Sequence, residues 1–227
     1  MADYYDTSVT VIGGTKESVK HFVELFEQEG YDGHYFYDSI INYDAHPTDI
    51  EIEENNGAFT VNFMAKCKNS VYACMMDGEY TGYGYYKNHP DEYEKLKPCT
   101  LEQACTELGV DVEIWSVRPD YYEEECYYEH YLFRNGEFEI SEDDEMLPLT
   151  FAYDPDEYED GEKVSYQKYI DNEIYDISKA AIQCVVPEEE WDEAVESGEY
   201  TEWTIDPEEW EDVFWSVVRE ISVLQTK

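Results

Sequence analysis

The first residues of the chain show a pattern that predicts a strand followed by a helix. Apolar and polar residues alternate from Thr7 to Ile12, which is the period of a strand, and two glycines follow. Thr15 then stands where a helix cap is expected, and Gly30 is the predicted stop. Between them, apolar residues recur at the helical spacing i, i+3, i+4 and i+7: Val19, Phe22, Val23 and Phe26.

The stretch that follows mixes irregular segments with one clear strand. Residues 31–56 hold Gly, Pro and Asn at close intervals and are interpreted as irregular. Alternation from Phe59 to Ala65 predicts a half-buried strand, and residues 71–76 are interpreted as its hairpin partner. Residues 77–98, which contain three glycines and two prolines, are interpreted mostly as loop.

A second helix and three further strands complete the predicted core. Thr100 and Gln103 form a capping box, so a short helix is expected to run to Gly109. Three strands are predicted next, the last two joined by the hairpin turn Asn135-Gly136: residues 110–115, 127–133 and 137–140. This order of strands and helices matches the split βαβ unit. We therefore expect an α+β fold, with a ferredoxin-like antiparallel sheet and helices on one of its faces.

Beyond Lys163 the pattern predicts an acidic, helical extension. Residues 164–182 fit a strand and a helix equally well. One acidic helix is predicted from Pro187 to Gly198, and a second after the capping residue Asp206. We expect two parts: a ferredoxin-like domain with an acidic hairpin region at 1–162, and a helical part at 163–227 packed on the same domain.

The charge of the chain is strongly one-sided. It has 227 residues, with 56 Asp and Glu against 14 Lys and Arg, which gives a formal net charge of −42. Hydrophobic residues make up 42% and aromatic residues 16%, so the chain can bury a core and is not a disordered acidic tail. Direct binding to nucleic acid or to anionic membranes is disfavoured, because both require clustered cations. Basic proteins, metal ions or a saline cytoplasm remain as explanations of the charge.

Sequence motifs give no candidate catalytic residue. None of the five histidines stands in a metal-ligand spacing, and His130, in a tyrosine-rich strand, is interpreted as a packing or surface residue. Asp154, Asp156 and Asp160 alternate as in a calcium loop, but Glu159 takes the place of the required glycine and Ser165 that of the final Glu. We expect no enzyme activity, cofactor or specific metal, with weak divalent binding as the alternative.

Six cysteines without a CxxC pair are typical of buried thiols in a reducing cytoplasm. The start of the chain does not resemble a signal peptide, and no apolar run approaches the roughly 20 residues of a membrane span. A cytoplasmic location is therefore expected.

The densest acidic and aromatic residues lie between Pro119 and Glu162, where no cation separates Arg134 from Lys163. Ordinary surfaces intersperse both signs of charge, so we interpret this stretch as a surface for a positive partner. Carboxylates can replace phosphates there, and aromatic rings can stack on arginine. The candidate partner-binding residues are Tyr121, Tyr122, Glu123, Glu124, Glu125, Tyr127, Tyr128, Glu142, Asp143, Asp144, Glu145, Asp154, Asp156, Glu157, Glu159 and Asp160.

Two stretches also carry a resemblance to a known family. The strand and helix from Thr7 to Gly30, and the segment from Leu101 to Phe138 with its Arg134-Asn-Gly-Glu137 turn, resemble YubB-type ferredoxin-like proteins of plasmids and phages. The resemblance covers about half of the chain and implies a mobile-element origin and the same fold.

In its overall character the chain resembles the DNA mimics that inhibit restriction or CRISPR systems. Its 42 excess charges equal the phosphates of roughly 21 base pairs. The leading hypothesis is a phage- or plasmid-encoded DNA mimic that blocks the nucleic-acid-binding groove of a host defence complex. The alternative is a non-catalytic acidic module that binds another basic protein.

Overall fold

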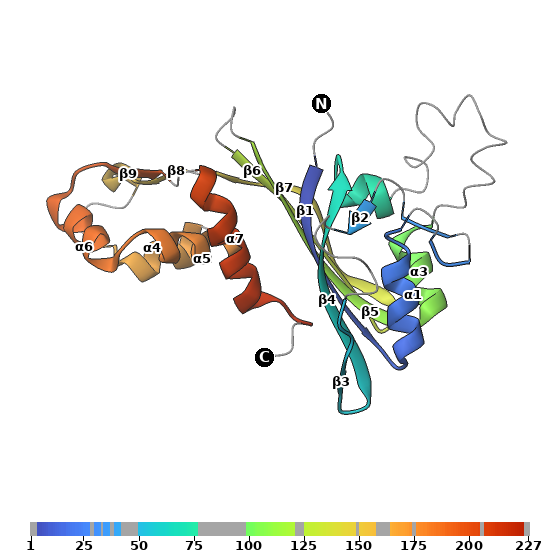
Figure 1. Ribbon diagram of the computed structural model, residues 1–227. Coiled ribbons are helices and arrows are strands. Elements are labelled where there is room, and N and C mark those ends of the chain that lie inside the picture. The colour runs from blue at the N-terminus through green and yellow to red at the C-terminus, as the bar shows by residue number, and fades with distance from the viewer. Residues whose placement is uncertain are drawn as a thin grey trace, which may run out of the picture. The chain divides into compact units, whose positions relative to one another are not determined.

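Figure 1 shows the chain as a computed structural model. The structure describes residues 4–27, 30–32, 34–36, 39–41, 50–76, 99–120, 125–148, 150–157, 164–173, 176–204 and 207–224. Within these ranges only the backbone is described at 119, 120, 125, 144–148, 150, 170–173, 176–178 and 207–210. The predicted loop at 77–98 lies outside the described residues.

The chain divides into two compact units. Unit 1 consists of Met1–Arg118, Tyr128–Glu145 and Val223–Lys227, and unit 2 of Pro119–Tyr127 and Met146–Ser222. Unit 1 therefore takes residues from both ends of the sequence. The expectation that residues 163–227 pack on the first domain stays a prediction.

Seven strands form one mostly antiparallel sheet, so the α+β class predicted from the sequence is confirmed. The order is β2-β4-β1-β5-β6-β7, and β3 also pairs with β4. The long strands β1 and β4 pair along ten residues each, and β1 pairs with β5 along its other edge. The strands are β1 (Tyr4–Gly13), β2 (Ser39–Ile41), β3 (Glu53–Asn55), β4 (Ala58–Lys68), β5 (Val110–Asp120), β6 (Glu125–Arg134) and β7 (Glu137–Pro148).

Two helices, α1 (Lys16–Glu24) and α3 (Leu101–Leu108), pack on one face of this sheet (Figure 1). Both predicted caps are confirmed: Thr15 accepts from the amide of Ser18 at 3.1 Å, and the capping box before α3 is complete. Gly109 ends α3 with a φ of 63°, the left-handed conformation that glycine adopts without strain. The predicted apolar residues Val19, Phe22, Val23 and Phe26 all lie in the core, but α1 ends at Glu24, before the predicted stop at Gly30, so Phe26 lies beyond the helix.

The predicted hairpin of β6 and β7 is also confirmed. Asn135 and Gly136 have φ of 56° and 88°, as a two-residue turn with both central residues left-handed requires. The amide of Asn135 donates to Asp111 Oδ1 at 3.0 Å, which attaches the turn to β5. β7 is longer than predicted and reaches Pro148, because its acidic residues continue the extended backbone instead of ending it.

Residues 71–76 were wrongly predicted as a strand; Tyr72–Met76 form a π-helix, η2. The run Val-Tyr-Ala-Cys-Met-Met has no alternation of apolar and polar residues. Its helical form is stabilised by hydrogen bonds to side chains outside the run. The amides of Val71 and Tyr72 donate to the Glu129 carboxylate at 2.7 and 2.9 Å, and Ser70 Oγ accepts from Ala73 N at 2.9 Å. Glu129 is 1% exposed, and it also accepts a hydrogen bond from the Tyr131 hydroxyl at 3.2 Å. A glutamate in a distant strand thus satisfies donors that the helix start leaves without partners.

Residues 31–56 were expected to be irregular, but they contain the strands β2 and β3. Phe36, in the same segment, packs in the core with 1% of its surface exposed. No disulfide joins the six cysteines, and five of them are buried, as predicted. Cys184 departs from that expectation because it is exposed on α5 (Asp176–Val185).

Among the described residues, no helix combines the length and the apolar character needed to cross a membrane.

Unit 2 combines a two-stranded sheet with helices. The ambiguous stretch 164–182 is helical at 166–173 and from 176 onward, and the two helices predicted after it are confirmed. Its main aromatic cluster surrounds Trp191, which is 1% exposed and contacts the rings of Tyr153, Tyr166, Tyr169 and Trp203. The elements of unit 2, besides α5, are β8 (Thr150–Tyr153), η5 (Pro155–Glu157), α4 (Tyr166–Glu173), α6 (Glu188–Ser197), β9 (Thr201–Thr204) and α7 (Pro207–Ile221).

The Glu129 contacts predict a measurable loss of stability. Glu129→Gln keeps the shape of the side chain but presents an amide NH2 to one of its donors. Because a buried group left without a partner costs about 1–3 kcal/mol, the free energy of unfolding should fall by that amount. Urea unfolding measures it. Glu139→Gln removes a carboxylate from a solvent-accessible ion pair and should change stability far less. Equal losses in the two variants would contradict the assigned role of Glu129.

Candidate functional site

Four of the predicted partner-binding residues are exposed acids in the structure. Glu142 and Asp143 lie on β7, and Asp156 and Glu157 lie on η5. The backbone of Glu125 is in β6 and those of Asp144 and Glu145 are in β7, but their side chains are outside the description. The remaining members outside the described residues are Tyr121, Tyr122, Glu123, Glu124, Glu159 and Asp160.

Three other predicted residues have environments that the sequence did not indicate. Tyr128 is 7% exposed, and its ring lies 6.5 Å from that of Trp115, so it belongs to the interior and not to a binding surface. Tyr127 is half-buried. Asp154 is half-buried, and its Oδ1 accepts from the amide of Asp156 at 2.9 Å. That contact starts η5 in the manner of an Asx turn, so Asp154 already has a structural role.

A further acidic surface lies on α6, outside the stretch proposed from the sequence. Six of its ten residues are acidic and all six are exposed, whereas Trp191 and Ala194 face inward. The first-turn Glu188, Glu189 and Glu190 are favoured by the helix dipole, but the later acids have no such local reason. The sequence from 180 to 218 contains no Lys or Arg, so no cation of this stretch neutralises the helix.

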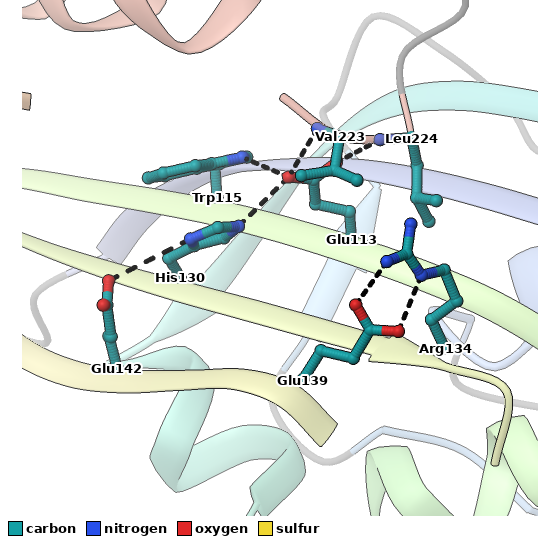
Figure 2. A network of polar contacts seen from close by, with 8 residues as sticks. All are labelled: Glu113, Trp115, His130, Arg134, Glu139, Glu142, Val223 and Leu224. Carbon is teal, nitrogen blue, oxygen red and sulfur yellow. Dashed lines mark hydrogen bonds and ion pairs between the residues drawn. The ribbon is translucent and has the colours of Figure 1, made fainter. Parts of the chain in front are cut away.

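A second cluster is polar and buried, on the face of the sheet opposite α1 and α3 (Figure 2). Along β5, Val112 and Ile114 point into the helix-covered core, so Glu113 between them points to the other face. Glu113 is 1% exposed. Its carboxylate accepts four hydrogen bonds: from Trp115 Nε1 (3.0 Å), His130 Nε2 (3.0 Å), Val223 N (3.1 Å) and Leu224 N (2.7 Å).

His130 completes this cluster. Its ring stacks on that of Trp115, with centroids 3.4 Å apart and planes 12° apart. Because an ionised carboxylate only accepts, His130 Nε2 carries a proton toward Glu113. On its other side, Nδ1 lies 4.0 Å from Glu142 Oε2, at the exposed end of the network. The imidazole therefore stands between one buried and one exposed carboxylate.

The electrostatics of Glu113 follow from its partners. Burial alone would raise the pKa of this carboxyl group, but the hydrogen bonds from His130, Leu224 and Val223 outweigh burial and lower the pKa below its usual value. Three of the four donors converge on Oε1, and Leu224 N meets Oε2. The arrangement favours a structural role that holds residues 223 and 224 against the sheet.

A cation close to this network, Arg134, is already paired. Arg134 forms a fork with Glu139, with Nε 2.8 Å from Oε1 and Nη2 in contact with Oε2 (Figure 2). This contact uses the last cation before the acidic run of β7. In the described part of the chain, no group of three or more His, Cys, Asp or Glu side chains is placed to hold a metal ion.

Sequence reasoning missed Glu113 and Glu129, and it gave His130 only a general packing role. A signal for Glu113 was present: the strand Val-Asp-Val-Glu-Ile-Trp-Ser-Val is apolar on both sides of the glutamate, which is typical of a strand buried on both faces. A glutamate within such a strand must find donors. The backbone donors of Glu113 are residues 223–224, and those of Glu129 are residues 71–72. No feature of the sequence marks either pair as a donor.

Comparison with protein-family models, curated proteins and solved structures finds no match to this chain. The acidic surfaces and the buried network are therefore interpreted from their own geometry.

The lowered pKa of Glu113 predicts a pH-dependent effect of Glu113→Gln. The ionised group stabilises the fold fully above its unfolded-state pKa, near 4.5, and this contribution is lost as pH falls through the lower folded-state pKa. At pH 7 the variant should be less stable by about 1–3 kcal/mol, because backbone N–H groups lose their acceptor. Urea unfolding at pH 7, 5, 4 and 3 should show the difference shrinking below about pH 4.5. Glu142→Gln serves as the exposed control, and a pH-independent difference for Glu113→Gln would refute the assignment.

Proposed function

We propose that this protein is an inhibitor that imitates DNA and occupies the nucleic-acid-binding groove of a host defence complex, such as a CRISPR effector or a restriction enzyme. Its partner is a basic protein, it uses no catalytic residue or cofactor, and it acts in the cytoplasm of the host cell. The observation that carries the proposal is the acidic surface of α6, whose six exposed carboxylates are fixed on a regular element.

The charge density of α6 approaches that of a duplex. Ten helical residues rise about 15 Å, so six carboxylates give one charge per about 2.5 Å of axis. Duplex DNA carries one charge per about 1.7 Å of axis. A rigid helix holds these charges at fixed spacings, as a duplex holds its phosphates, and a disordered acidic tail does not. The strand β7 and the helix η5 carry further exposed acids.

A ferredoxin-like core and a mobile-element origin belong to the same proposal. β2 and β1 are both antiparallel to β4, so they run parallel to each other, and α1 lies between them in the chain. β4 and β5 are both antiparallel to β1, with α3 between them. Two crossovers of this kind, with the order β2-β4-β1-β5, are what a ferredoxin-like core requires. This topology supports the resemblance to YubB-type proteins, with β6 and β7 added at one edge.

The alternative is an acidic module that binds a basic protein away from any nucleic-acid groove, as a chaperone of histone-like proteins does. The same exposed carboxylates on α6 favour it, since they would attract any cationic surface. The two proposals differ in one respect. A DNA mimic and a duplex exclude each other from the target, whereas a module that binds elsewhere does not compete.

Loss of inhibition should accumulate with the number of carboxylates removed. Each exposed charge pair contributes only about 0.2–1 kcal/mol, so no single Glu→Gln change on α6 should abolish inhibition of target cleavage. Neutralising Glu188, Glu189, Asp192 and Glu196 together should weaken it by more than tenfold. A second variant neutralises four of the residues predicted from the sequence, to compare their effect on inhibition with that of α6: Glu142, Asp143, Asp156 and Glu157. One folded point variant that removes all inhibition would instead indicate a catalytic or metal site.

Competition and salt dependence test the proposal directly. With the target complex immobilised, bound inhibitor should prevent duplex binding, and bound duplex should delay the inhibitor. Association should slow steeply from 0.1 to 1 M salt, because the Debye length falls from about 10 to about 3 Å. Dissociation should change less, since it depends on short-range contacts. Simultaneous binding of inhibitor and duplex would exclude mimicry and leave the acidic-module alternative.

A further inference from the structure

Unit 2 contains an open groove between α6 and β9. Its volume is about 350 Å³, at the lower end of the range for small-ligand sites, so it has room for one large side chain. The helix contributes four residues at the spacing i, i+3, i+4 and i+7, which lie on one face of α6. The lining residues are Glu190, Glu193, Ala194, Ser197, Thr201 and Trp203.

The groove combines an aromatic wall with negative charge. Trp203 is half-buried, and it is held in place by stacking on the buried Trp191, with ring centroids 5.3 Å apart and planes 24° apart. Its backbone pairs with Phe151 of β8. The carboxylates of Glu190 and Glu193 are exposed on the adjacent helix face. A fixed aromatic ring therefore lies beside two carboxylates that can reorient.

The end of α6 adds a second source of negative potential. The groove extends to Ser197, in the last turn, where the helix dipole places partial negative charge. A helix commonly has a Lys, Arg or His there, but α6 has no basic residue in its last turn. Ser197 is already engaged, since its Oγ donates to Ala194 O at 2.9 Å and accepts from Glu199 N at 3.2 Å. The charged and aromatic groups that line the groove are the two carboxylates and the indole ring.

We infer that this groove receives an arginine side chain of the basic partner. The guanidinium is planar, so it can stack on Trp203 while its fork of N–H donors pairs with Glu190 or Glu193. Lysine supplies charge without a plane to stack and without a two-point fork. An anion is repelled, and two carboxylates give a divalent metal too few ligands. The inference rests on the proposed function, for which it names the chemical group that the partner inserts.

The test uses the isolated full chain and two short capped peptides, Ala-Arg-Ala-Arg-Ala and its lysine counterpart. Amide and indole NMR shifts are followed during titration at low salt. The arginine peptide should perturb the Trp203 indole N–H and the amides of Ala194, Ser197 and Thr201 most strongly. It should bind at least three times more tightly than the lysine peptide.

Two double variants with the same loss of charge locate the site. Glu190→Gln with Glu193→Gln removes the lining carboxylates. Glu189→Gln with Asp192→Asn removes exposed carboxylates at the same spacing on the same helix, away from the groove. The first should weaken binding of the arginine peptide about five- to tenfold, and the second less than twofold. Trp203→Leu, checked for folding by circular dichroism, should remove the preference for arginine over lysine.

Equal losses in the two double variants, or equal affinity for the two peptides, would overturn the inference and leave only diffuse attraction to the helix. This result is separable from failure of the proposed function. If the peptide occupies the groove but the protein does not compete with duplex on its target, the arginine site is supported and DNA mimicry is refuted. If competition holds but is equally weakened by both double variants, mimicry stands and the arginine site fails.

Discussion

The scarcity of cations is the constraint on which the rest of the structure depends. The chain has four acidic residues for each Lys or Arg, so there are too few cations to pair with every carboxylate. Glu113 and Glu129, each 1% exposed, are held by backbone, indole, imidazole and phenol donors instead. Each also takes two backbone N–H groups from a segment far away in sequence. These carboxylates act as connectors: Glu129 fixes η2 on the helix-covered face of the sheet, and Glu113 fixes residues 223–224 on the other.

Aromatic residues solve the complementary problem of building an interior in such an acidic chain. The helix α6 offers only a narrow inward stripe, because six of its ten positions are acidic. Trp191 occupies that stripe, and one large ring there contacts four other aromatic residues. An aromatic side chain buries more apolar area than an aliphatic one at the same position, so few inward positions suffice. Trp203 has both roles: its ring stacks on the buried Trp191 and also lines the groove between α6 and β9.

Sequence patterns predicted the parts of this fold whose causes are local. The caps at Thr15 and Thr100, the Asn135-Gly136 turn and the alternation of β4 each depend on residues within a few positions of one another. Residues 71–76 could not be predicted in the same way, because their helical form depends on Glu129, more than fifty residues away. The acidic stretch proposed as the site was only partly placed on the described surface, and Tyr128 proved to be interior. Charge density in the sequence does not distinguish an exposed acid from one that faces inward, since that depends on which strands become central.

The bonds from residues 223 and 224 to Glu113 also set an order of events during synthesis. Unit 1 begins with the first strand of the chain but includes two residues that follow α7. A nascent chain can form the sheet and its two helices early. The far face of that sheet must then keep Glu113 hydrated until residues 223 and 224, more than a hundred positions beyond it in the chain, have emerged from the ribosome. Glu113 thus gains two of its four donors only when residue 224 has been made, and a chain stopped short of it would keep the donors of Trp115 and His130 but lack those two backbone N–H groups.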